Sequence, residues 1–276
     1  MKETGTEPTV TLSRRELING LASGAVVALT GASTSGCSTN EALGRSQFLL
    51  VSDGDLARLA AQSWSQALES NRQTSDAALR RRVAGVGERI VRAADQRYPQ
   101  QRLSQYDWEF AVFEDDTVNA WVMPGGKVGF HTGLLEIMDN DDQVAAVMGH
   151  EAGHVVGRHA AERYSKQMAA AGGLAVAGVA LEASDVENSA LIAGILGAGV
   201  TFGLILPYSR MHEYEADRLG ADLMVGADYR AEEAVSFWET MTERSGQRPL
   251  EFMSTHPSDQ NRIAAMQTYI ARMGYA

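Results

Sequence analysis

The sequence has 276 residues, of which 45% are hydrophobic and 21% are charged, as in an ordinary globular protein. Its formal net charge of −11 leaves no electrostatic case for nucleic-acid binding, so we expect no nucleic acid among its partners. The single cysteine excludes an intramolecular disulfide, and the length allows one sizeable domain or two small ones.

Residues 1–36 resemble an export signal. The stretch Ser13-Arg14-Arg15-Glu16-Leu17-Ile18 resembles a twin-arginine signal, and the apolar run that follows is too short for a membrane span. Small residues before Cys37 resemble a lipoprotein cleavage box, in which Cys37 becomes the lipidated first residue. Thr34 stands where such boxes usually carry Leu, and the alternative is a cleaved signal with an incidental cysteine. We expect a lipid-anchored protein on the periplasmic face of the bacterial envelope, at the outer membrane.

Residues 37–54 are rich in Ser, Thr, Asn and Gly and are predicted to link that anchor to a domain over residues 55–276. Helical spacing of apolar residues predicts helices over Leu56–Ser70 and Ala77–Asp95. Alternation and turn residues predict a small antiparallel sheet of three strands, Trp108–Phe113, Val118–Val122 and Lys127–Phe130.

The stretch Asp141–Lys166 carries the motif His150-Glu151-Ala152-Gly153-His154 and is predicted to form a buried helix capped by Asp141. The four-residue spacing places His150 and His154 on one face, where two imidazoles can share a zinc ion. Glu151 lies about 100° round the helix, where it can act as a base on water without binding the metal. The alternative is a long helix that carries these residues by chance.

The predicted helix Arg210–Gly226 offers a third ligand. Glu213 and Asp217 share its apolar side, whereas Glu215 falls on a side predicted to be solvated. A buried carboxylate needs a partner to offset its desolvation, so Glu213 is the predicted ligand. Asp217, one turn further, can accept the outer N–H of a ligand histidine. The alternative for both carboxylates is a buried salt bridge, for example to Arg210.

Residues 168–206 are mostly apolar and are predicted to form a helical hairpin over or beside the metal site, with membrane contact as the alternative. Helices are then predicted over Glu232–Thr242 and Asp259–Met273. Between them, His256 is placed to donate to an oxyanion, and the alternative is an ordinary loop histidine. Arg262 is a second candidate donor. The other histidines, His131, His159 and His212, are predicted to be structural.

The sequence contains four motifs that belong together: Asn119-Ala120-Trp121-Val122-Met123-Pro124-Gly125-Gly126-Lys127, His150-Glu151-Ala152-Gly153-His154, Glu213-Tyr214-Glu215-Ala216-Asp217 and His256-Pro257. In combination they resemble one family of zinc endopeptidases, metallopeptidase family forty-eight, which includes the CAAX prenyl proteases, mitochondrial Oma-type proteases and bacterial periplasmic quality-control proteases. The resemblance covers about Leu56 to Met273 and points to the short bacterial lipoprotein branch.

The resemblance implies a gluzincin active site, with one Zn²⁺ per chain on His150, His154 and Glu213, Glu151 as the base and Asp217 behind a ligand histidine. Together with the helices and strands predicted above, the expected fold is an α+β, mainly helical gluzincin domain with a small antiparallel sheet beside the metal helix, and His256 is the second catalytic candidate. A strand edge beside the metal helix can hold an extended peptide, and the substrate-binding candidates are Asn119, Pro124, Gly125 and Gly126. The alternative is that Gly125 and Gly126 only form a turn.

The expected function is zinc-dependent cleavage of unfolded or misassembled cell-envelope proteins by a metal-activated water. The competing function is a latent zinc-bound chaperone or assembly factor, in which His256 occupies the fourth zinc position.

Overall fold

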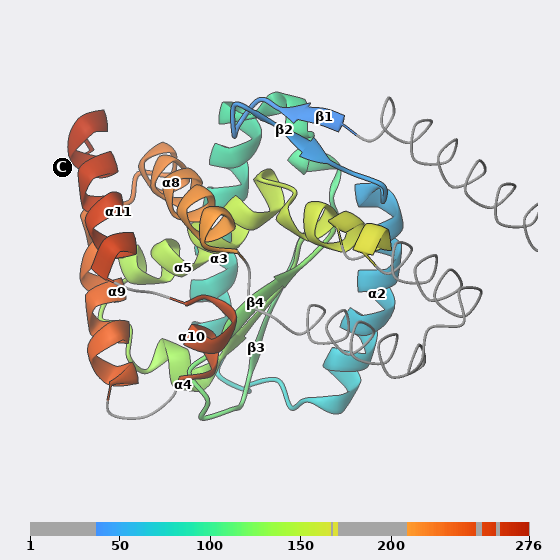
Figure 1. Cartoon of the computed structure of the whole chain (residues 1–276). Helices are drawn as coiled ribbons and strands as arrows, with labels where there is room; N and C mark the ends of the chain where they lie inside the picture. Colours follow the sequence, from blue (N-terminus) through green and yellow to red (C-terminus); the bar gives the residue numbers. More distant parts are fainter. Residues whose placement is uncertain (1–36, 167, 171–208, 247–249, 258–259, 276) are drawn as a thin grey trace, which may run out of the picture.

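The computed structural model describes residues 37–166, 168–170, 209–246, 250–257 and 260–275. Helices dominate, with a two-stranded and a three-stranded sheet, so the predicted α+β, mainly helical class is confirmed. In Figure 1 the helices α3 (Ala77–Arg97), α5 (Asp141–Val156) and α8 (Arg210–Gly226) lie together, with the larger sheet beside α5. Helix α2 (Asp53–Ser70) lies on the far side of that sheet from α9 (Glu232–Ser245) and α11 (Gln260–Met273).

The larger sheet consists of β3 (Glu109–Phe113), β5 (Lys127–His131) and β4 (Ala120–Met123), in that order. Strands β4 and β5 are antiparallel, as predicted, because a tight turn joins them. Strand β3 instead runs parallel to β5, so the sheet is mixed and not fully antiparallel. The hairpin places β5 between the other two strands, which leaves β4 at the edge that faces α5.

The predicted long helix of the motif is divided in two. Asn140, and not Asp141, caps α5, since its side chain accepts the amide of Gln143. The helix ends at Val156 because Arg158 adopts the left-handed conformation, with φ at 53°. The chain is helical again over residues 159–166, so the turn at Gly157 and Arg158 separates two helical segments.

Residues 37–54, which the sequence predicts to be a linker, contain two strands. Strands β1 (Cys37–Asn40) and β2 (Arg45–Phe48) form an antiparallel hairpin. The buried side-chain amides of Asn40 and Gln47 donate to the carbonyls of Val156 and Gly157, over 3.0 and 2.7 Å. These bonds satisfy carbonyls that the end of a helix leaves without partners, so the hairpin belongs to the fold.

Helices α5 and α8 approach closely because small residues face one another. A Cβ at Gly153 would lie 2.6 Å from the carbonyl oxygen of Ala216, and one at Gly149 would lie 3.0 Å from that of Gly220. Glycine therefore lets the two backbones meet. This contact brings the side chains of α8 within reach of the motif on α5.

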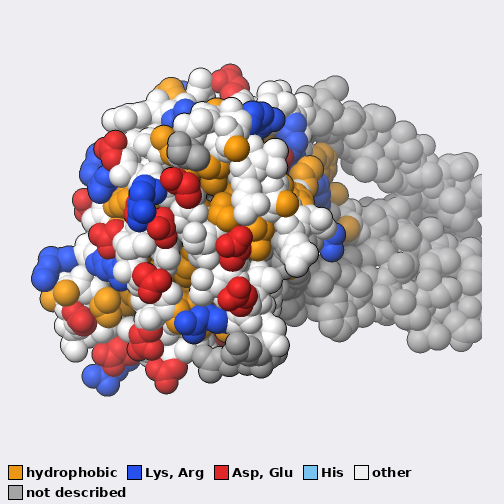
Figure 2. Space-filling view, turned by 90° about the vertical axis from the view of Figure 1, so that its left-hand side faces the viewer, with side chains coloured by type: hydrophobic (Ala, Val, Ile, Leu, Met, Phe, Trp, Pro, Cys, Tyr) orange, Lys and Arg blue, Asp and Glu red, His pale blue; other side chains and the backbone are white. Residues whose placement is uncertain are grey.

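The remaining named elements are four short helices. They are the short helices Pro99–Gln101 (η1), Leu103–Gln105 (η2), Thr132–Leu135 (α4) and Glu251–Thr255 (α10). On the described part of the face that carries α9 and α11, acidic and basic side chains are interspersed and no histidine is visible (Figure 2). No helix among the described residues is both long and apolar enough to cross a bilayer. The predicted apolar hairpin lies almost entirely outside the described residues.

Candidate metal centre

His150 and His154 lie side by side on α5, as their spacing predicts. Their Nε2 atoms are 3.1 Å apart, and their ring centroids are 4.7 Å apart. Both side chains are buried, at 1% and 2% exposure, because α5 is covered by α3, α8, α9 and β4. Two imidazole nitrogens therefore point at one place inside the protein.

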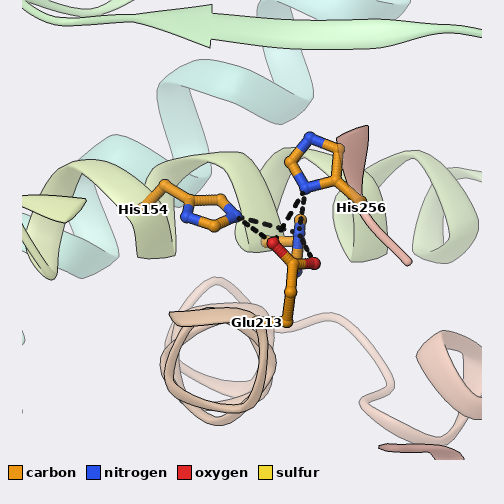
Figure 3. Close-up of side chains that lie close together, drawn as sticks. His154, Glu213 and His256 are labelled. Carbon is orange, nitrogen blue, oxygen red and sulfur yellow. Dashed lines mark hydrogen bonds and ion pairs between the residues drawn. The ribbon is translucent and has the colours of Figure 1, made fainter. Parts of the chain in front are cut away.

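Glu213 projects from α8 towards His154 and His256 (Figure 3). Its Oε2 lies 3.5 Å from Nε2 of His150, and its Oε1 lies 3.4 Å from Nε2 of His154. The structure thus brings together the three residues that the sequence predicts as ligands. The side chain is 1% exposed, and the neighbouring imidazoles hold the pKa of Glu213 well below its usual value against the opposing effect of burial.

His256 completes the group from the segment before α11. Its Nδ1 lies 3.1 Å from Nε2 of His150 and 3.3 Å from Oε1 of Glu213. Its ring stacks on Phe252, with centroids 4.7 Å apart, and is 3% exposed. One donor atom from each of the four residues lies within 4.8 Å of all the others, so His256 is not an ordinary loop histidine.

Asp217 and Arg262 stand behind His150. Oδ1 of Asp217 lies 2.9 Å from Nδ1 of His150, as predicted for the outer nitrogen of a ligand. Arg262 donates to both carboxylate oxygens of Asp217, over 2.5 and 2.7 Å, and lies 2.8 Å from Glu213. Its guanidinium also lies 4.2 Å from the ring centre of Trp238. The buried cation beside the two carboxylates is therefore Arg262, and not the Arg210 that the sequence offers.

Glu151 lies on the side of the group that faces β4. It is 1% exposed, and its Oε1 lies 3.4 Å from Nε2 of His256. Burial raises the pKa of Glu151, while the nearby imidazoles and the backbone amide of Val122 act against that rise. Its Oε1 accepts no hydrogen bond among the described residues, so the oxygen is available to a proton donor in the site.

The two histidines of α5 differ in electrostatics. Burial disfavours the imidazolium of His150, but the carboxylates of Asp217 and Glu213 outweigh burial and raise its pKa to about 9. For His154 burial prevails, and the pKa is well below the usual value. One proton on His150 therefore neutralises part of the buried negative charge of the metal-free site.

The donor set fits a zinc ion. Imidazole nitrogens and a carboxylate oxygen are the donors that zinc takes in catalytic sites, and three of them leave a position for water. The four donor atoms are close enough to share one ion, and all four side chains are buried. Asp217 behind His150 supplies the outer hydrogen bond that ligand histidines usually make.

His159 and Glu215 are neighbours of the site that the sequence does not predict. Nδ1 of His159 lies 2.9 Å from Nδ1 of His154, and its Nε2 lies 3.1 Å from Oε2 of Glu215. Five residues along a continuous helix would turn His159 away from His154. The left-handed Arg158 breaks the helix and returns the ring to the site, and the adjacent Gly157 is the only hint of that break in the sequence.

The predicted substrate-binding residues occupy different places. Asn119 is buried, and its amide donates to Glu251 of α10 over 2.9 Å. Gly125 and Gly126 have φ of +85° and +87° and form the turn between β4 and β5, which is compatible with either prediction. Pro124 and Gly125 also line a small cavity of about 30 Å³ that reaches His154. Their role towards a substrate stays a prediction.

Comparison with known proteins identifies relatives of this chain. The model of the family described as "Peptidase family M48" matches residues 77–270. The mitochondrial metalloendopeptidase OMA1 of Schizosaccharomyces pombe is 37% identical over 170 residues, which are 61% of this chain and 48% of that protein. That of Saccharomyces cerevisiae is 34% identical over 201 residues, 69% of this chain and 56% of that protein.

A bacterial relative is also found. The beta-barrel assembly-enhancing protease of Escherichia coli (strain K12) is 32% identical over 164 residues, which are 57% of this chain and 33% of that protein. The chain thus spans about half, or less, of the length of these curated relatives.

Proposed function

The chain belongs to peptidase family M48, and from that premise we propose that it is a zinc-dependent endopeptidase. The observation that carries the proposal is the convergence of His150, His154 and Glu213 from two helices on one buried point, with Glu151 beside it. The matching relatives named metalloendopeptidase support it.

In this proposal His150, His154 and Glu213 hold one Zn²⁺ per chain. The bound ion would lower the pKa of water and polarise a peptide carbonyl. Asp217 holds the outer nitrogen of His150, and Arg262 holds Asp217, so the ring is fixed before any ligand enters.

Glu151 is the proposed base. Its carboxylate takes a proton from the attacking water and then donates it to the leaving amine, and burial, which raises the pKa of Glu151, makes the carboxylate a stronger base. His256, 3.4 Å from Glu151, is the proposed donor to the oxyanion. Both side chains are buried, so hydrogen bonds made there are stronger than in water.

The edge strand β4 is the proposed binding place of the substrate. An unfolded peptide can add to such an edge through main-chain hydrogen bonds, and β4 lies against α5. Pro124, Gly125 and Gly126 would then lie beside the bound peptide, and Asn119 at the start of the strand. The proposed substrates are unfolded or misassembled envelope proteins, in keeping with the name of the Escherichia coli relative. Lipidation at Cys37, after removal of residues 1–36, would hold the protein on the periplasmic side of the outer membrane.

Metal analysis with a casein-cleavage assay tests the proposal. The wild-type protein should contain one zinc per chain and cleave unfolded casein. Glu151→Gln should retain the zinc and lose cleavage, since the amide cannot accept the proton. Stoichiometric zinc with full cleavage by Glu151→Gln would remove Glu151 from its role, and a zinc-free wild-type protein would overturn the proposed function.

A second candidate function is a latent zinc-bound chaperone or assembly factor. Four donors within 4.8 Å, His256 included, form the closed type of set that is usual in structural zinc sites. In this candidate His256 takes the position that a catalytic site keeps for water. Zinc-loaded wild-type protein that prevents aggregation of unfolded casein without cleaving it would favour this function.

A further inference from the structure

The outer nitrogens of the two α5 histidines are held differently. Nδ1 of His150 meets a carboxylate directly, that of Asp217. Nδ1 of His154 instead lies 2.9 Å from a second imidazole, His159, whose Nε2 lies 3.1 Å from Oε2 of Glu215. His154 therefore reaches its carboxylate through an intervening ring.

Zinc binding in the proposed function determines which ring nitrogens of His154 and His159 carry protons. His154 points Nε2 at Glu213, so binding a metal through that atom leaves its proton on Nδ1. Nδ1 of His159 must then accept, which leaves the proton of His159 on Nε2, facing Glu215. Only this arrangement gives each of the two hydrogen bonds one donor and one acceptor.

His154, His159 and Glu215 thus form a chain of hydrogen bonds. Arg45 from the N-terminal hairpin binds Glu215, the last residue of this hydrogen-bond chain. Its Nε and Nη2 donate to the two carboxylate oxygens over 2.6 and 2.8 Å, a bidentate pairing. The same guanidinium donates to both oxygens of Glu162, over 3.2 and 2.9 Å. Arg45 is 170 residues from Glu215 in the sequence, so this contact joins the N-terminal hairpin to α8.

The same hairpin also holds the end of α5. The amides of Asn40 and Gln47 donate to the carbonyls of Val156 and Gly157, two and three residues after His154. Gln47 further donates to Glu162 over 2.8 Å, and Arg45 donates to the same carboxylate, so the contacts of Asn40, Arg45 and Gln47 gather at one place. The hairpin therefore contacts both the helix that carries His154 and the carboxylate that ends its hydrogen-bond chain.

We propose that His159 and Glu215 are positioning residues that hold His154 as an Nε2 ligand, and that Arg45 completes this arrangement from the N-terminal hairpin. The hairpin β1–β2 is then part of the metal centre. This inference rests on the proposed function, because it requires that the site binds zinc.

Zinc affinity tests the proposal independently of cleavage. We expect Arg45→Met, Glu215→Gln and His159→Phe each to raise the zinc dissociation constant about 10- to 100-fold in competition with a chromophoric chelator. Arg58→Met is the matched control, because Arg58 makes an exposed ion pair with Asp55 away from the site and should leave the constant unchanged. If all three variants bind zinc with wild-type affinity, the inference is wrong and the proposed function stands. If the wild-type protein binds no zinc, the proposed function itself is wrong.

The tautomer of His159 gives a second measurement, which needs no variant to fold. Long-range ¹H–¹⁵N correlation spectra of the zinc-loaded full chain distinguish a ring with its proton on Nε2 from one with its proton on Nδ1. We expect the Nε2–H form for His159 and the Nδ1–H form for His154. A proton on Nδ1 of His159 would overturn the inference, because that ring could not then accept from His154.

Discussion

Oδ1 of Asp217 lies 2.9 Å from Nδ1 of His150, and the two residues stand on different helices, α8 and α5. Glu213, one turn before Asp217 on α8, faces the other nitrogen of the same ring. Helix α8 thus presents both a candidate metal ligand, Glu213, and the residue that orients the ligand His150, Asp217. The spacing of four residues on α8 is therefore as specific for the site as the spacing of the two histidines on α5.

Asp217→Asn should weaken zinc binding and destabilise the fold. The amide keeps the shape of the side chain but removes the charge that pairs with buried Arg262 and His150. We expect about 10- to 100-fold weaker zinc binding and a loss of unfolding free energy of about 3 kcal/mol. Chelator competition and urea unfolding measure the two effects. Asp228→Asn on the surface is the control, and an unchanged zinc affinity in Asp217→Asn would contradict the assigned role.

His256→Ala separates the two candidate functions. If His256 donates to the oxyanion, its removal should lower casein cleavage about 100-fold while zinc stays bound. If it occupies the fourth metal position instead, its removal opens that position, and cleavage should rise. The cleavage rate at saturating zinc distinguishes the two roles, because it falls in the first case and rises in the second. An unchanged rate would argue against both roles.

The sequence predicts the parts of the site that depend on local helix geometry. His150, His154, Glu213 and Asp217 follow from a period of 3.6 residues, which holds inside any regular helix. The existence of most helices and strands follows in the same way from apolar spacing. The close packing of α5 against α8 depends on tertiary structure. The small residues at their contact are compatible with it, but their spacing alone does not predict which two helices meet.

Contacts between distant segments are what the sequence does not predict. The parallel pairing of β3 with β5 depends on which side of the hairpin the earlier strand joins, and the turn residues carry no information on that choice. His159 reaches His154 only because Arg158 adopts a left-handed conformation. Arg45 lies in a segment whose composition is typical of a linker, yet it binds Glu215 across most of the chain.

The stability of the metal-free protein should fall as the pH rises from about 6.5 to 9. The pKa of His150 is raised to about 9 in the folded state by Asp217 and Glu213, against about 6.5 when unfolded. Its contribution to the unfolding free energy is therefore complete below pH 6.5 and is lost as the pH passes through 9. Urea unfolding of the apoprotein between pH 6 and 10 measures this loss, and a flat profile would contradict the raised pKa.

Zinc binding should release this proton. Below about pH 9 the metal displaces a proton from His150, so we expect roughly one proton per zinc at pH 7 to 8 and fewer above pH 9. Titration calorimetry in buffers of different ionisation enthalpy measures the number of protons released per zinc ion bound. Zinc affinity should accordingly rise with pH up to about 9. Binding without proton release at pH 7 would show that His150 is neutral in the metal-free site.

Gly153→Ala should separate the two helices that form the site. The added Cβ would lie 2.6 Å from the carbonyl oxygen of Ala216, which is backbone and cannot rotate away, so α5 or α8 must shift. We expect a loss of about 1–3 kcal/mol of unfolding free energy from overpacking. Because Glu213 lies one turn before Ala216 on α8, the shift also moves it away from His154, and zinc binding should weaken.

Gly85→Ala on α3 is the matched control for that substitution. Gly85 is an exposed residue in a helix interior with nothing within 4 Å of the added Cβ, so alanine should stabilise the protein by about 0.5–1 kcal/mol through helix propensity alone. Thermal unfolding and chelator competition on both variants separate packing from propensity. Equal zinc affinity in Gly153→Ala and Gly85→Ala would show that the α5–α8 distance does not govern the metal centre.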